Sequence, residues 1–262
     1  MKEAFVVLGN QLFDKKHLIT YKKNCHFFLQ EDHGLCTYFK HHKQKIYYFL
    51  ASMREYRDYL KLNNFEITYY ELDQNVKNFK NYFDGLDFFL NKKKIKKINI
   101  FDIEDLKFKK EFEKYCSKKD FKYEYHSSPM FLLKREDFSK FSDYKKPQLS
   151  SFYSQIRKKF NILMDKDRPI GGKWSFDEDN RKRLPKDYKK FTPQQFESKY
   201  FKPIKDLIQK HFSDHFGELN PKILFPFNTK DSKKVLENFI HNKFNHFGDY
   251  EDFIHDGDLT IN

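Results

Sequence analysis

The stretch "AFVVLG" at residues 4–9 is a short, continuous apolar run that ends in glycine. Buried strands of parallel sheets have this composition, because helices cover both faces of such sheets. Four similar runs follow it, "CHFFLQ" (25–30), "FEITYYEL" (65–72), "KINIFDI" (97–103) and "FKYEYH" (121–126). Helical patterns separate them at 43–62, 75–91 and 105–118. This alternation predicts an α/β fold, a Rossmann-like, doubly wound parallel sheet over residues 1–130.

The character of the chain changes after Pro129. Strand signals become weaker, and helices are predicted at roughly 134–142, 147–164, 193–212 and 231–246, with Thr192 as a candidate N-cap. We therefore expect an α/β domain at 1–130, an intervening segment at 131–192 and a mainly helical part at 193–262.

Composition limits the class of protein. The net charge of +13 suggests a polyanionic partner, but most of the excess is lysine, which also forms solvated surfaces. The sequence has no apolar run near the ~20 residues that a membrane span needs, and no signal peptide follows Met1. Three cysteines without CxxC spacing favour a reducing, cytoplasmic location over a disulfide framework.

Polar residues follow the first two predicted strands. Gly9, Asn10 and Gln11 come after the first, and Glu31 and Asp32 after the second. In open α/β sheets, ligands bind beyond the carboxyl ends of the strands. Because GxGxxG is absent, a planar heterocycle held by these groups and by an aromatic neighbour such as Tyr38 is favoured over a dinucleotide. Turn and capping residues would have the same composition.

A second polar stretch, "RPIGGKWSFDEDNRKR" at 168–183, contains the only tryptophan, Trp174. Gly171 and Gly172 predict a tight turn, and Trp174 is expected to be largely buried where the α/β and helical parts meet. The charged residues around it can pair with one another, so a structural loop is one interpretation.

Other motifs carry weaker signals. "HHKQK" (41–45) places positive charge before a helix, where the dipole disfavours it. Arg54 is expected to pair with Glu55 or with a carboxylate of another domain. His211, Asp214 and His215 have metal-ligand spacing, but a surface histidine pair is favoured because a third ligand is not evident. The sequence has no GxSxG elbow of a Ser/His/Asp hydrolase.

Several of these stretches together resemble the photolyase-related family, the iron–sulfur bacterial cryptochromes and photolyases. The polar loop is similar to that family's interdomain signature through Gly171, Gly172, Lys173, Trp174, Asp177, Asn180 and Arg181, with Ser175 and Asp179 as mild departures. Matches in the same order flank it: "VLGNQL" (7–12), "HKQKIYYFLASMREY" (42–56), "SPMFL" (128–132), "FYSQIRKKFNILMD" (152–165) and "FGDYED" (247–252).

The resemblance implies a pigment site. In the family, the N-terminal α/β domain holds an antenna, 6,7-dimethyl-8-ribityllumazine, at the ends of the first strands. The positions that match its pocket or approach are Gly9, Asn10, Gln11, Glu31, Tyr38, His42 and Lys45. Asn10 stands where aspartate is usual, which removes one charge.

The resemblance also implies a larger protein. Family members continue into a helical bundle that binds FAD and supplies four cysteines to a [4Fe–4S] cluster, and none of Cys25, Cys36 and Cys116 matches those ligands. We expect this chain to be the N-terminal part of a light-dependent DNA-repair flavoprotein (a DNA photolyase, a lyase), as a fragment or with a separate C-terminal half. The alternatives are a cryptochrome-type light sensor and a Rossmann-like nucleotide- or nucleic-acid-binding module.

Overall fold

The computed structural model describes residues 3–73, 78–142, 148–186 and 192–251. Contacts divide the chain into two compact units. The first consists of residues 1–130 with 195–233, and the second of residues 131–194 with 234–262. The first is called the α/β unit below, and the second the helical unit.

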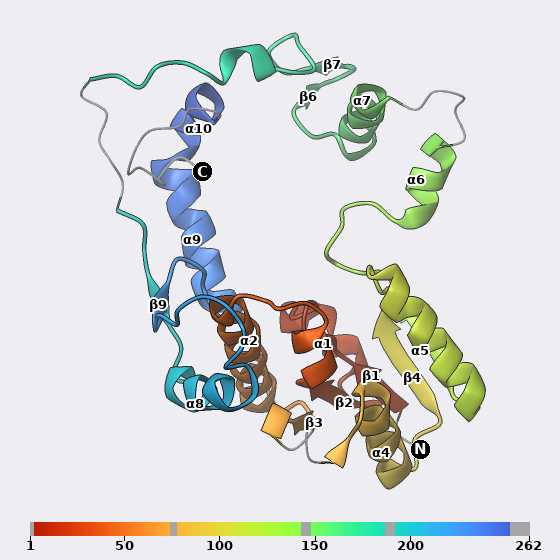
Figure 1. Cartoon of the computed structure of the whole chain (residues 1–262). Helices are drawn as coiled ribbons and strands as arrows, with labels where there is room; N and C mark the ends of the chain where they lie inside the picture. Colours follow the sequence, from red (N-terminus) through yellow and green to blue (C-terminus); the bar gives the residue numbers. More distant parts are fainter. Residues whose placement is uncertain (1–2, 74–77, 143–147, 187–191, 252–262) are drawn as a thin grey trace. The chain divides into compact units, whose positions relative to one another are not determined.

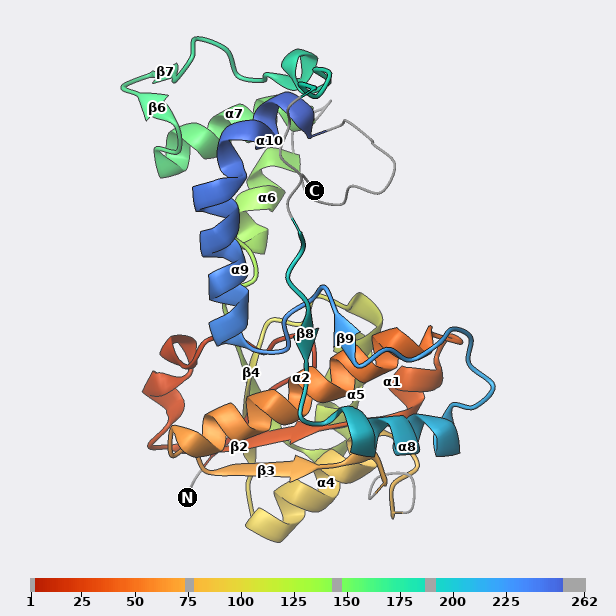
Figure 2. The ribbon, with the colours of Figure 1, turned by 90° about the vertical axis from the view of Figure 1, so that its left-hand side faces the viewer.

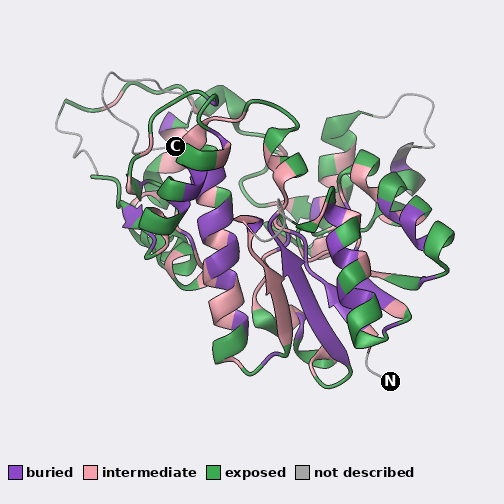
Figure 3. Ribbon diagram, turned by 60° about the horizontal axis from the view of Figure 1, so that its bottom comes forward, coloured by how far each residue is buried: buried purple, intermediate pink, exposed green. Residues whose placement is uncertain are grey.

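The α/β unit is built on a five-stranded parallel sheet in the order β3-β2-β1-β4-β5. The strands are β1 (Glu3–Val6), β2 (Cys25–Gln30), β3 (Ile67–Tyr70), β4 (Lys97–Phe101) and β5 (Lys122–His126). All five predicted strands are confirmed, and the apolar runs of β1, β2 and β4 are buried. Figure 3 shows strands coloured as buried or intermediate between helices whose outer surfaces are exposed.

Helices cover both faces of the sheet. Neighbouring residues of a strand point to opposite faces, so each strand contributes side chains to two layers. Ala4 and Val6 pack with α4 (Tyr82–Lys93) and α5 (Leu106–Lys119) on one face. Phe5 packs with α2 (Lys43–Leu62) on the other face. The predicted helix at 75–91 begins only at Tyr82, where Asn81 caps it; residues 74–77 lie outside the described part.

Residues 195–233 pack on the outer side of α2. Their helix α8 (Phe201–His211) buries Ile204, Leu207 and Ile208 against α2, and Figure 2 shows the two helices side by side. A short antiparallel pair, β8 (Phe196–Glu197) with β9 (Lys222–Ile223), precedes and follows α8. The prediction of a helix over 193–212 with Thr192 as its cap is therefore wrong for its first eight residues, since a strand precedes the helix and Tyr200 stands at its N-cap.

Short elements complete the α/β unit. Two 3-10 turns, η1 (Lys15–His17) and η2 (Ile19–Tyr21), lie between β1 and β2, and α1 (His33–Thr37) follows β2. Figure 1 gives the order of all labelled elements along the chain.

The helical unit contains α6 (Arg135–Ser142), α7 (Leu149–Phe160), most of α9 (Thr229–Asn242) and α10 (Phe244–Tyr250). It also contains a hairpin of β6 (Met164–Asp165) and β7 (Arg168–Pro169), and a 3-10 turn, η3 (Asp177–Asp179). Gly171 and Gly172 follow the hairpin with φ of +82° and +76°, which confirms the predicted turn.

Trp174 is half-buried, so the prediction that it is largely buried is wrong. The guanidinium of Arg157, on α7, lies 5.3 Å from its ring centroid, and the ammonium of Lys158 lies 5.4 Å away. Arg157 is itself buried and donates to the carbonyls of Ile162, Leu163 and Trp174 at 3.2, 2.6 and 3.3 Å. An arginine packed on its face, and not an apolar core, therefore holds the tryptophan.

Replacing Arg157 with alanine should release Trp174. The substitution removes three hydrogen bonds to carbonyls and the cation that packs on the ring, so we expect a loss of stability of about 2–3 kcal/mol. Because Trp174 is the only tryptophan, its emission should shift to the red and become easier to quench with iodide. Lys158→Ala, which removes the exposed cation, should have a much smaller effect. An unchanged emission maximum in Arg157→Ala would contradict this packing.

Candidate functional site

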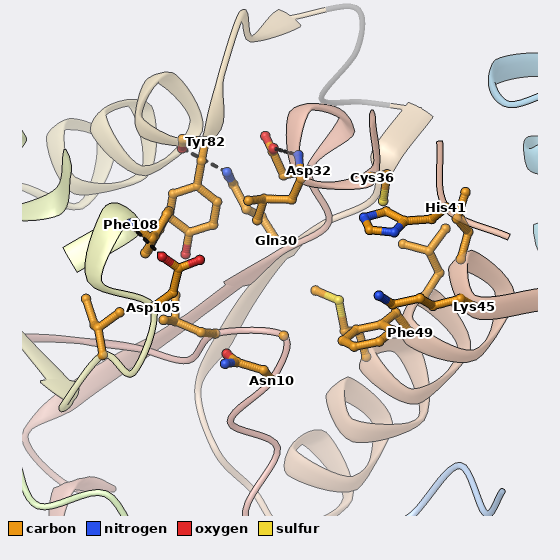
Figure 4. Close-up of a pocket in the computed structure, with 17 residues that line it drawn as sticks. Asn10, Gln30, Asp32, Cys36, His41, Lys45, Phe49, Tyr82, Asp105 and Phe108 are labelled. Carbon is orange, nitrogen blue, oxygen red and sulfur yellow. Dashed lines mark hydrogen bonds between the residues drawn. The ribbon is translucent and has the colours of Figure 1, made fainter. Parts of the chain in front are cut away.

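A cavity of about 250 Å³ lies beyond the carboxyl ends of β1, β2 and β4. The chain turns from β1 toward β2 and β3 on one side and returns to β4 on the other, so this is the switch point of the sheet. The lining is largely apolar, from Leu8, Leu35, Ile46, Phe49, Leu50, Met53, Ile103 and Phe108. The polar lining residues are Asn10, Gln30, Asp32, His41, Lys45, Tyr82 and Asp105 (Figure 4).

A wider groove of about 900 Å³ continues from the cavity between α1, α4 and α5. The two share the lining residues Asp32, Leu35, His41, Tyr82, Asp105 and Phe108. A ligand with a compact ring and a longer side chain would fit such a pair of compartments.

Three of the predicted site residues line the cavity itself. Gly9 and Asn10 follow β1, and Lys45 is on the first turn of α2. A Cβ atom at position 9 would lie 3.0 Å from the sulfur of Met53, so glycine keeps this wall free of a side chain. Tyr38 lines the adjoining groove, where Lys107 lies 4.2 Å from its ring centroid.

His42 has a structural contact at the start of α2. Its Nδ1 accepts a hydrogen bond from the backbone N–H of Gln44 at 3.0 Å, which makes it the N-cap of the helix. Its side chain faces a third hollow, together with Lys45, Tyr48 and Phe225. The structure therefore places His42 beside the cavity and not in its lining.

Gln11 and Glu31 are fully buried and are absent from the lining. Gln11 donates to the carbonyl of Asp102 at 2.8 Å and to Glu104 at 3.0 Å. Glu31 accepts hydrogen bonds from Arg54, Tyr69 and the N–H of Leu72. The expectation that Arg54 pairs with Glu55 or with a carboxylate of another domain is wrong, because the buried Glu31 pairs with it.

Several lining residues were not predicted from the sequence, among them Gln30, Tyr82, Asp105 and Phe108. Tyr82 is on the first turn of α4, and Asp105 is the N-cap of α5. Both follow strands that also end at this edge of the sheet. The capping pattern before each helix is the signal that would have identified them.

Unpaired polar atoms gather around the cavity. Within the described residues, six buried side-chain oxygens have no hydrogen-bond partner, and four belong to Gln11, Gln30, Tyr82 and Glu104. Gln30 and Tyr82 line the cavity, while Gln11 and Glu104 neighbour lining residues in the sequence. Buried polar groups are nearly always paired, so the oxygens of Gln30 and Tyr82 fit a polar ligand or ordered water in the cavity, whereas Gln11 and Glu104 lie outside its lining.

Burial also changes the ionisation of the lining. It raises the pKa of Asp32 and the pKa of the Tyr82 hydroxyl above their usual ranges. It lowers the pKa of His41, and the nearby Lys45 and His215 lower that pKa further. Burial therefore favours the neutral forms of Asp32, Tyr82 and His41.

Next to the cavity lie four histidines: His33 on α1, His41 just before α2, His211 at the end of α8 and His215 after it. His33 stacks on Phe212 with centroids 5.4 Å apart, and the Nδ1 of His215 lies 2.8 Å from the carbonyl oxygen of His41. His211 ends α8 and contacts Asp73, and His215 is buried beyond the helix. The prediction of a surface histidine pair is therefore wrong.

This histidine cluster should make the α/β unit sensitive to acid. Burial, together with His211 and His215, lowers the pKa of His33 below its ordinary value of about 6.5. The unfolded chain then binds protons at a higher pH than the folded chain, so stability decreases as the pH falls through that value. We expect a lower melting temperature at pH 5.5 than at pH 7.5, measured by circular dichroism. His33→Gln should reduce the difference, whereas the exposed His241→Gln should leave it unchanged.

The loop residues of the second polar stretch all belong to the helical unit. Lys173 lies 6.0 Å from the ring centroid of Phe176, Asp177 begins η3, and Asn180 has a buried, unpaired Oδ1. The other predicted residues of this stretch are Gly171, Gly172, Trp174 and Arg181.

The model of the family "Deoxyribodipyrimidine photo-lyase-related protein" matches residues 5–224. This range includes the end of β1, the other four strands of the sheet, the residues that line the cavity and the glycine turn. The chain belongs to this family.

Two relatives show how the family match extends along the chain. A "(6-4) photolyase" of Agrobacterium fabrum (strain C58) is 23% identical over 270 residues, which cover 100% of this chain and 52% of that protein. "Uncharacterized protein R852" of Acanthamoeba polyphaga mimivirus is 28% identical over 197 residues, covering 71% of this chain and 96% of that protein. This member of the photo-lyase-related family thus spans about half the length of the photolyase that it matches.

No group of three or more histidine, cysteine or acidic side chains is placed to hold a metal ion in the part of the chain that the structure describes. Over the same residues, the helices are too short or too polar to cross a membrane.

Proposed function

We propose that the cavity at the switch point binds an antenna pigment, 6,7-dimethyl-8-ribityllumazine, in a protein of the photolyase-related family. The observation that carries this proposal is the cavity itself, which has largely apolar walls and includes Gln30 and Tyr82, whose side-chain oxygens have no hydrogen-bond partner. Its apolar walls suit a planar ring, and its adjoining groove suits a polyhydroxylated side chain. Gly9, Asn10 and Lys45 would lie against the pigment, with Tyr38 in the groove.

The bound pigment would absorb light and pass the excitation on to a flavin. We propose that the whole protein is a light-dependent DNA-repair enzyme, with DNA as its partner, FAD as its redox cofactor and the cytoplasm as its location. This rests on the family and on the "(6-4) photolyase" relative. The FAD and the [4Fe–4S] cluster would be held by residues that correspond to the other half of that relative.

The three cysteines of this chain do not fit a cluster. They are on separate elements, β2, α1 and α5. Burial raises the pKa of Cys25 to about 11, and those of Cys36 and Cys116 to about 12. Cluster ligands are thiolates, and these thiols are strongly biased toward the protonated form.

An absorption experiment tests the pigment proposal. The purified chain is incubated with the lumazine, passed through a desalting column and measured in the near-ultraviolet. We expect about one equivalent of retained pigment, and no stoichiometric retention of FAD in a parallel sample. Loss of all lumazine on the column, with a Kd weaker than about 1 mM by titration, would contradict the proposal.

A repair assay tests the role of the whole protein. Ultraviolet-damaged DNA is illuminated with the chain alone and with a C-terminal half added. Repair is expected only in the second sample. Light-dependent repair by the chain alone would overturn the assignment of FAD to the other half.

A further inference from the structure

The amino-terminal edge of the parallel sheet, opposite the edge with the cavity, gathers a dense group of lysines. At this edge each helix of the sheet ends and the next strand begins. The turn from α4 to β4 therefore lies beside the turn from α5 to β5, and the N–H of Lys122 donates to the carbonyl of Lys96 at 3.0 Å. Six exposed lysines lie on or next to these two turns, and they are called the lysine edge below: Lys92, Lys93, Lys94, Lys96, Lys118 and Lys122.

The turn before β2 extends this positive surface. The N–H of Glu3, at the start of β1, donates to the carbonyl of Asn24 at 2.9 Å, so this turn lies beside the first residue of β1. Lys22 and Lys23 are on the turn, and the ammonium of Lys22 lies 5.3 Å from the ring centroid of Phe65. Lysines therefore lie at the starts of β2, β4 and β5, which are strands on both sides of β1.

The acidic side chains next to the lysine edge are paired with other lysines. Lys97 binds Glu3 at 3.3 Å and Glu124 at 2.9 Å. Lys119 binds Asp87 at 3.1 Å. Within the residues that the structure describes, the six side chains of the lysine edge have no ion-pair partner. The fold itself therefore leaves their charge without a neutralising group.

Helix dipoles account for only part of this charge. Lysines in the last turn of a helix are stabilised by the dipole, and three members of the lysine edge have that position. Lys96 and Lys122 lie outside the helices, and Lys122 stands opposite Lys97 in the register of β4 and β5, where like charges repel. Asp120, the C-cap of α5, supplies a single carboxylate to these two turns. The excess of lysines thus has a cost in stability that a bound polyanion would offset.

The aromatic ring beside the centre of the lysine edge is buried. The ammonium of Lys96 lies 5.5 Å from the ring centroid of Phe121, which is 6% exposed. Phe88, near Lys92, is 50% exposed, but its ring packs against Phe79 on the outer face of α4. Proteins bind single strands through exposed rings on which bases stack, and bind membrane surfaces through exposed apolar side chains. A duplex keeps its bases inside and presents phosphates, so a surface of charges fits it best.

We propose that the lysine edge binds the phosphate backbone of duplex DNA without sequence selection. This contact goes beyond the proposed function, because it requires neither the pigment, the FAD nor a damaged base. It would lie on the α/β unit, at the edge of the sheet opposite the pigment cavity. Its strength should come from the release of counterions, so it should decrease steeply as the salt concentration rises.

Fluorescence anisotropy with undamaged DNA tests this proposal. The purified chain is titrated in the dark into a labelled duplex of about 20 base pairs at several salt concentrations, and we expect a Kd of about 1–100 µM at low salt. A variant that combines Lys93→Gln, Lys96→Gln and Lys122→Gln should bind at least about tenfold more weakly. Its slope of log K against log salt should be smaller by about 2–3, which is close to one per lost phosphate contact. An unchanged melting temperature of the variant would show that the fold is intact.

A second triple variant is the matched control. Lys202→Gln, Lys205→Gln and Lys230→Gln remove the same charge from exposed positions on α8 and at the start of α9. Because these positions lie away from the proposed contact, this variant should keep its affinity for the duplex within about twofold.

The other outcomes would overturn the proposal. Equal weakening in both variants would show that only the net charge matters. A Kd for the duplex above about 1 mM at low salt, or tighter binding of a single strand of the same length, would also contradict it. Vesicles with phosphatidylserine that bind the chain through the same lysines, in the absence of duplex binding, would assign the surface to a membrane. Since the assay uses undamaged DNA in the dark, its failure would leave the pigment and repair proposals standing.

Discussion

Replacing Glu31 with alanine is expected to destabilise the α/β unit by about 3–5 kcal/mol, because it would leave the buried guanidinium of Arg54 without its main partner. The Glu31 side chain is 0% exposed and that of Arg54 is 5% exposed. Their closest contact, Arg54 Nε to Glu31 Oε1, is 2.6 Å. Glu31 also accepts from the Tyr69 hydroxyl and the Leu72 N–H, both at 2.7 Å, so the variant would lose these bonds too.

Urea unfolding followed by circular dichroism measures this effect. Glu71→Ala is the matched control, since Glu71 also approaches Arg54, at 3.7 Å, but its side chain is 41% exposed. The control should cost no more than about 1 kcal/mol. A loss below about 1 kcal/mol in Glu31→Ala would contradict the role given to this buried pair in stability. Weakened pigment binding in this variant would report damage to the fold and not a lost contact to the ligand.

Phe212→Ala is expected to have a comparable effect, about 3–5 kcal/mol, through the cavity that it would leave. Phe212 is 0% exposed and belongs to the apolar cluster that joins α8 to α2. It also stacks on His33 and meets His215 edge-on at 5.3 Å. The variant should weaken the attachment of residues 195–233 to the rest of the α/β unit.

Hydrogen exchange is the measurement that localises the effect. Amides of α8 should lose protection in Phe212→Ala before those of the central strands do. Phe225→Ala, at a side chain that is 64% exposed, should change stability by less than about 0.5 kcal/mol. Equal loss of protection in β1 and α8 would contradict a local anchoring role for Phe212.

The sheet could be predicted from the sequence because its signals are local. β1, β2 and β4 are runs of mainly apolar residues, and β1 and β2 are buried along nearly their whole length. The segment before α8 could not be predicted in this way. Its two-residue strand, β8, pairs with β9 about 25 residues later, and no local pattern reports so distant a partner.

The position of the site could be predicted from the sequence, but several of its lining residues could not. Gly9, Asn10 and Lys45 line the cavity because they follow strand β1 or begin helix α2 at the correct edge. Polarity alone cannot distinguish a ligand contact from a buried structural ion pair. Glu31 was therefore predicted as a site residue, although its carboxylate is paired with Arg54. Tyr82 comes from a helix start after the third strand, and only the folded sheet brings it beside β1.

The discontinuity of the α/β unit has a consequence for synthesis on the ribosome. Its first piece ends near residue 130, but the cluster on α2 closes only when residues 195–233 have been made. At translation rates of about 5–20 residues per second, that interval is roughly 5–20 s. During this time the side of α2 that carries Tyr47 and Leu50 lacks the α8 side chains that cover it in the folded unit. The nascent chain therefore presents an apolar helix face that chaperones can bind, well before the unit is complete.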